Sequence, residues 1–138
     1  MNEYEAISSV GGSRAGAPGA LMVCVTGKHT CEKLLERGAH LRQPAQRLFA
    51  VHCVQTGRTF LNTAYEPLAI EYLFSLSSLF DAELTILRAN NVIDALVEFA
   101  ETNRVSRIVL GASPEKTGDS FVSRLSSRLP DVEFVVVD

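Results

Sequence analysis

Two short clusters of glycine, hydroxyl and lysine residues could hold an anion. One is Thr26-Gly27-Lys28, and the other runs from Gly111 to Ser120. Glycine lets backbone amides approach a phosphate, a hydroxyl at a helix start can donate to it, and lysine adds positive charge. The candidate ligand-binding set is Thr26, Gly27, Lys28, Gly111, Ser113 and Ser120. These residue types are also common in turns and helix caps, and Lys28 could equally be a solvated residue at a helix entry.

Groupings that would support catalysis or metal binding are not found in the sequence. The histidines are His29, His40 and His52, and the cysteines are Cys24, Cys31 and Cys53. No Ser–His–Asp order, carboxylate pair, H-E-x-x-H or C-x-x-C is present. Cys24 and Cys53 fall in apolar runs, which favours buried reduced thiols, and His52 is expected to be a hydrogen-bonded core histidine. We therefore expect no enzymatic activity and no metal.

Strand and helix signals alternate along the chain after residue 19. Strands are predicted at 20–25, 48–54, 83–87, 107–110 and 132–137, and helices at 29–42, 64–80, 90–103 and 120–129. Continuous apolar runs such as 20–25 are typical of strands covered on both faces. Five strands joined through four helices predict a parallel sheet with helices on both faces.

The predicted helices carry more specific expectations. The second helix should bury one face made of Ile70, Leu73, Phe74, Leu76 and Phe80. The third should be capped by Asn90 or Asn91 and closed by Asn103. Its inner face is expected at Val92, Ala95, Leu96, Phe99 and Ala100.

A doubly wound sheet binds ligands at the carboxyl ends of its strands, where the winding direction reverses. With the first and fourth strands adjacent, that crevice lies between the loop after Thr26 and the loop after Leu110. The candidate ligand-binding set falls on these two loops.

Composition and charge indicate the class of protein and its location. The chain has 138 residues, 46% of them apolar, and a formal charge of −3, which argues against nucleic-acid binding. Residues 1–19 are rich in Gly, Ser and Ala and predict a flexible tail before one domain at 20–138. The apolar runs are strand-sized and no signal segment is recognisable, so we expect no membrane association and a cytoplasmic location.

Three segments together resemble a known family. They are Leu21–Gly27, the stretch from Asp94 through Val105-Ser106-Arg107-Ile108-Val109-Leu110-Gly111-Ala112-Ser113, and Ser120–Leu125. In this order they are similar to the universal stress protein family, most closely the domain found in potassium-sensing histidine kinases of the KdpD type. The resemblance covers about residues 20–138. It implies an α/β three-layer sandwich with strand order 3-2-1-4-5.

The nucleotide-binding members of that family use an Asp after the first strand and a loop of the form G-x-x-G-x9-G-[ST] after the fourth. Gly111 matches the first glycine, but Pro114 stands at the second and has no N–H to donate. The final Gly-Ser appears as Asp119-Ser120 and comes too early. The Asp after the first strand is absent. ATP is therefore expected to bind poorly.

The resulting hypothesis is a non-catalytic regulatory or sensor module that acts through protein contacts in stress or potassium and osmotic signalling. It would need no cofactor, with at most a weakly held ATP, AMP or other anion. Expected partners are a second copy, paired through the apolar edge strand Val132–Val137, and a sensor kinase or other signalling protein. The alternative is an ATP- or AMP-binding universal stress protein with a diverged phosphate loop. A small hydrolase or a flavodoxin-like electron carrier is the weakest reading.

Overall fold

The computed structural model describes residues 19–25, 30–56, 66–111 and 120–137, apart from the side chain of Glu66. Residues 1–18, which make up all but the last residue of the expected tail, lie outside this part. Gly19 belongs to the described fold, because its carbonyl oxygen accepts a hydrogen bond of 2.6 Å from Nε2 of Gln46. The described part of the chain thus starts one residue before the expected domain boundary.

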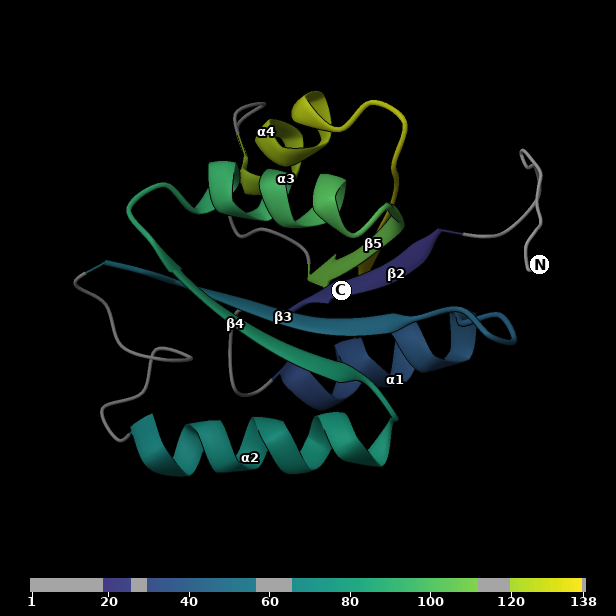
Figure 1. Cartoon of the computed structure of the whole chain (residues 1–138), viewed down its shortest axis with the longest axis vertical. Coiled ribbons are helices and arrows are strands. Elements are labelled where there is room, and N and C mark those ends of the chain that lie inside the picture. The colour runs from purple at the N-terminus through teal and green to yellow at the C-terminus, as the bar shows by residue number, and fades with distance from the viewer. Residues whose placement is uncertain (1–18, 26–29, 57–65, 112–119, 138) are drawn as a thin grey trace.

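In the described part of the chain, five strands and four helices alternate, as predicted (Figure 1). In chain order they are β2 (Ala20–Cys24), α1 (Cys31–Leu41), β3 (Leu48–Gln55), α2 (Glu66–Leu79), β4 (Glu83–Ala89), α3 (Val92–Thr102), β5 (Val105–Gly111), α4 (Phe121–Arg128) and β6 (Glu133–Val137). The strands form one sheet in the order β4-β3-β2-β5-β6, and every neighbouring pair is parallel. The predicted order, 3-2-1-4-5 in chain order, is confirmed.

The sheet is the middle of three layers, with α1 and α2 on one face and α3 and α4 on the other (Figure 1). The central strand β2 is buried along its whole length, and successive side chains point to opposite faces. Leu21 and Val23 pack with α1 and α2, whereas Met22 and Cys24 pack with α3 and α4. The continuous apolar run of β2 therefore supplies both cores at once.

Two predicted helix ends are confirmed. Asn91 is the N-cap of α3, and its side-chain oxygen accepts from the backbone N–H of Asp94 at 3.0 Å. Asn103 is the C-cap of the same helix. Such caps satisfy backbone groups that the helix itself leaves unpaired, so they fix where α3 begins and ends.

The predicted inner face of α2 is wrong at one residue. Leu73 and Leu76 are buried, and Ile70 and Phe80 pack partly against the core, but Phe74 is mostly exposed. The inward side is completed by Ala69 and Ser77. Apolar residues occur all around α2, so their spacing does not define one face, and contact with the sheet decides which side is covered.

Candidate functional site

The carboxyl ends of β2 and β5 lie side by side, since Val23 pairs with Val109 and Cys24 with Leu110. The chain leaves β2 toward α1 on one face of the sheet and leaves β5 toward α4 on the other. The winding direction therefore reverses between these two strands. The reversal thus lies between the two strands where it was expected.

Only two of the six candidate ligand-binding residues lie in the described part of the chain. Thr26, Gly27, Lys28 and Ser113 fall outside it. Gly111 ends β5 and is half-buried; a methyl group added there would lie 4.0 Å from Leu34 Cδ1, so its described surroundings do not require glycine. The described residues therefore do not test the predicted set as one site, and it stays a prediction.

Ser120 is the N-cap of α4. Its hydroxyl oxygen accepts from the backbone N–H of Ser123 at 3.2 Å. This is the ordinary capping role that the sequence left open as the alternative to anion binding.

His52, on β3, lies next to the end of β2 and is buried. Its Nδ1–H donates to the carbonyl oxygen of Val25. Burial lowers the pKa of the imidazole; the hydrogen bond to Val25 acts in the opposite direction, and the charge of Arg88 lowers the pKa further. His52 is therefore neutral near pH 7 and engaged with the backbone, as predicted for a core histidine.

None of the three cysteines forms a disulfide; Cys24 and Cys31 are buried, and Cys53 is half-buried. Burial raises the pKa of Cys24 to about 12 and that of Cys31 to about 11, and it also raises the pKa of Cys53. A thiol that stays protonated is neither a good nucleophile nor a good metal ligand. Within the described ranges, no group of three or more His, Cys, Asp or Glu side chains could hold a metal ion.

A polar cavity of about 330 Å³ opens beyond the ends of β3 and β4. It is lined by Gln55, Asn90, Asn91, Val92, Ile93, Phe121 and Arg124. These residues come from the end of β3, the β4–α3 junction and the first turns of α4. The cavity therefore lies at the carboxyl edge of the sheet, where such folds bind ligands.

The donors of this cavity fit a flat polar or anionic molecule. The Asn91 oxygen is taken by its capping bond, and Nε2 of Gln55 donates to the Asn90 carbonyl oxygen at 3.4 Å. Arg124, exposed on the first turns of α4, brings a guanidinium, and Phe121 an aromatic ring. Sequence reasoning missed Gln55, Phe121 and Arg124, since three segments far apart in the sequence build the cavity.

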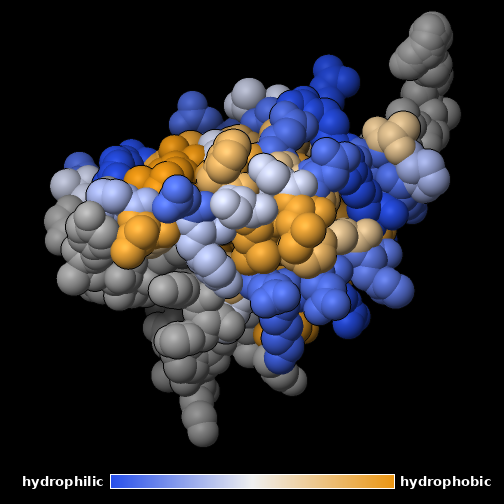
Figure 2. Space-filling model, turned by 90° about the horizontal axis from the view of Figure 1, so that it is seen from below, coloured by the Kyte–Doolittle hydropathy of each residue, from blue (hydrophilic) through white to orange (hydrophobic). Residues whose placement is uncertain are grey.

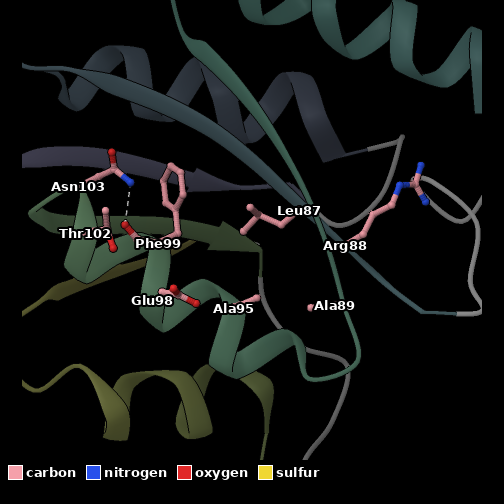
Figure 3. A pocket seen from close by; sticks show the side chains of 8 residues that line it. All are labelled: Leu87, Arg88, Ala89, Ala95, Glu98, Phe99, Thr102 and Asn103. Carbon is pink, nitrogen blue, oxygen red and sulfur yellow. Dashed lines mark hydrogen bonds between the residues drawn. The ribbon is translucent and has the colours of Figure 1, made fainter.

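A second cavity, of about 400 Å³, lies between β4 and α3 (Figure 3). Leu87 and Phe99 form its apolar part, and the Phe99 ring stands edge-on to Phe49 with centroids 5.1 Å apart. Nδ2 of Asn103 donates to the Phe99 carbonyl oxygen at 2.9 Å, and the Arg88 side chain points away from the cavity (Figure 3). The Asn103 side chain thus caps the end of α3. The cavity lies on the flank of α3 and not between β2 and β5.

No family model matches the chain. In sequence, the chain is 29% identical over 123 residues to a putative sensor protein KdpD from Synechocystis. This similarity covers 85% of the chain and 33% of the relative, so the chain spans about a third of that protein's length.

Solved structures of universal stress proteins share the fold. One from Archaeoglobus fulgidus superimposes with a TM-score of 0.60 at 19% identity, covering 88% of this chain and 100% of that one. The same comparison with a universal stress protein from Archaeoglobus fulgidus in complex with dAMP gives a TM-score of 0.57 at 20% identity, covering 87% and 98%. A universal stress protein in complex with cAMP gives 0.59 at 14% identity, covering 88% and 98%. The chain therefore has the universal stress protein fold, with sequence similarity to KdpD.

Proposed function

We propose that this chain is a non-catalytic regulatory domain of the universal stress protein type, acting through protein contacts in stress or potassium and osmotic signalling. The observation that carries this proposal is its similarity, over most of its length, to a putative sensor protein. In that relative, the matching region is about a third of a longer chain. A regulatory domain in such a chain would act on the other domains of the same protein.

The state of the reactive side chains supports a role without catalysis. His52 is buried and bonded to a backbone carbonyl, and burial raises the pKa of all three thiols. A catalytic base or nucleophile needs a pKa near the working pH and access to substrate. The buried thiols of Cys24 and Cys31 meet neither condition, and buried His52 lacks access to substrate.

A second candidate function is binding of ATP or AMP. It is favoured by the neighbouring structures that hold dAMP and cAMP, and by the cavity of about 330 Å³ with Phe121 and Arg124 in its wall. Against it stand Pro114 and Asp119 in the loop after β5, which remove an amide donor and add a negative charge where phosphate would lie. We therefore rank nucleotide binding second.

The setting we propose is the cytoplasm, with a sensor kinase or another signalling protein as partner. Three cysteines that form no disulfide fit a reducing compartment. A homodimer through β6 belongs to the same proposal, because β6 is an edge strand of the described sheet and edge strands offer backbone groups to a partner.

Native mass spectrometry of gently purified protein tests this assignment. We expect the mass of the chain without nucleotide, since tight nucleotide binders commonly retain their ligand. A nucleotide retained on each chain would promote the second candidate. Loss of that nucleotide in Arg124→Gln, but not in Arg37→Gln on the exposed side of α1, would locate it in the cavity beside α4.

A further inference from the structure

The helix α2 carries an unusual amount of exposed apolar surface. Four large apolar side chains in the described part are exposed, and three of them belong to α2: Leu68 at 60%, Phe74 at 61% and Leu79 at 74%. The fourth, Val136, lies on β6. Figure 2 looks onto the face that α2 covers and shows apolar side chains gathered there among polar ones. Contiguous apolar surface of this kind on a folded domain marks a contact site.

The spacing of these side chains suits a helical partner. The helix has 14 residues and is about 21 Å long. Leu68, Tyr72, Ser75 and Leu79 follow one another at intervals of four, three and four, which places them along one stripe of the helix, as in helix–helix seams. Phe74 lies on the other flank of the outward side. Ser75 and Ser78 are small and allow close approach between the two.

The charges on α2 itself have one sign. The two charged residues of this helix are Glu66 and Glu71, and it contains no Lys or Arg. On α1, the charge of Glu32 acts on Tyr72 and contributes, after burial and Cys31, to raising the pKa of that phenol. Arg42, beside the end of α2, is bonded to Asp81, so acidic groups outnumber basic ones among these residues, which favours a partner with basic residues beside its apolar face.

We propose that the outward face of α2 binds an amphipathic helix of a signalling partner, with an apolar stripe to cover Leu68, Phe74 and Leu79 and flanking Lys or Arg to meet Glu71 and Glu32. The proposal rests on the proposed function and names the surface through which that function is exerted. A second copy of this chain fits less well, because pairing α2 with itself would bring acidic residues of the two copies together.

A fluorescent synthetic peptide of 18 residues, built from Leu and Lys so that all leucines lie on one helical face, is the probe. Fluorescence anisotropy at physiological salt should show saturable binding at micromolar concentration. Leu79→Ser and Phe74→Ser should each weaken it about tenfold or more, and Glu71→Gln by a smaller factor. Val136→Ser removes an exposed apolar side chain elsewhere and should leave binding unchanged. All four positions are on the surface, so the variants should fold.

The proposal is overturned if a peptide of the same composition in scrambled order, or one with Glu in place of Lys, binds equally well. It is also overturned if the α2 variants bind like the wild type. Self-association abolished by Leu79→Ser would assign the surface to a second copy, and binding to phosphatidylcholine vesicles abolished by the same change would assign it to lipid; each contradicts the proposal. Nucleotide binding by the same variants is measured separately, so failure here remains distinct from failure of the proposed function.

Discussion

The imidazole of His52, on β3, is tied through its Nδ1–H to the carbonyl oxygen of Val25, directly after the central strand β2. The carbonyl can only accept, so the proton is on Nδ1. The contact joins two neighbouring strands at the carboxyl edge of the sheet, next to the predicted crevice. Burial lowers the pKa of the imidazole below its ordinary value of 6.5, although the hydrogen bond to Val25 acts in the opposite direction, so His52 is neutral near pH 7.

Burial of the His52 imidazole makes the stability of the domain depend on pH. The pKa of His52 is lower in the folded than in the unfolded state, so the unfolded chain takes up the proton first as pH falls. The free energy of unfolding should therefore decrease as pH drops from about 6.5 toward the folded-state pKa, and level off with respect to this group below it. Urea denaturation between pH 7.5 and 5 measures this.

The matched variants are His52→Leu and, on the exposed side of α1, His40→Gln. At pH 7.5, the free energy of unfolding of His52→Leu should be lower than that of the wild type by roughly 1–3 kcal/mol, because the Val25 carbonyl oxygen loses its buried donor. Between pH 7.5 and 5, the free energy of unfolding of this variant should also decrease less with falling pH. An unchanged pH dependence in His52→Leu would assign the effect to other groups.

Gly38, in the middle of α1, lies where a side chain has no room. A methyl group added there would come within 2.5 Å of Val23 Cγ2, and the stiff, buried Val23 cannot turn aside. Ala usually stabilises a helix relative to Gly by about 1 kcal/mol, but here we expect Gly38→Ala to destabilise the domain by roughly 1–3 kcal/mol. Gly111→Ala is the control, because its methyl would meet neighbours only at 4.0 Å and should change stability little. Thermal unfolding of the two variants measures the contrast, and equal melting temperatures would refute it.

Most of the fold could be predicted from the sequence, and the reasons are local. The apolar run of β2 has one good structural interpretation, and the pair Asn90 and Asn91 predicts the start of α3 to within one residue. Phe74 does not, because α2 is apolar on several sides and only contact with the sheet decides which side is covered. The cavity that includes Gln55 and Arg124 could not be predicted, because it exists only when the ends of β3, β4 and the start of α4 meet in space.

The N-terminal segment should be dispensable for stability. Residues 1–18 contain few large apolar side chains, so they offer little to bury against the domain. A truncated chain that starts at Gly19 keeps the carbonyl that Gln46 binds and should melt within a few degrees of the full chain. A melting temperature lower by about ten degrees, on the order of 2 kcal/mol for a domain of this size, would show that the segment packs.

Pairing through β6 can be tested on its exposed side chain. Val135 and Val137 pack partly against the core, whereas Val136 points outward and is 47% exposed. If β6 joins two copies, light scattering at tens of micromolar should give the mass of a dimer, and Val136→Lys should give a monomer, because charge on an edge strand opposes pairing. A monomeric wild-type chain would contradict the prediction, as would a dimer that survives Val136→Lys.

Weak nucleotide binding follows from the loop after β5. Pro114 removes one amide donor, the loop is shorter than the family pattern, and Asp119 adds negative charge. Each charged hydrogen bond that is not made forfeits roughly 1.5–3 kcal/mol, so two losses should weaken a micromolar site about a hundredfold or more. One flexible ammonium at Lys28 does not replace a preformed cradle.

Isothermal titration with Mg-ATP near neutral pH tests the central claim most directly. If the chain is a regulatory domain without a nucleotide site, the heat of titration should show no saturation, or should fit a dissociation constant above about 100 μM. A micromolar site reaches this value after a hundredfold loss of affinity. A dissociation constant below about 10 μM, abolished by Lys28→Ala or by a bulky residue in place of Gly111, would contradict the account and establish the chain as a nucleotide-binding universal stress protein.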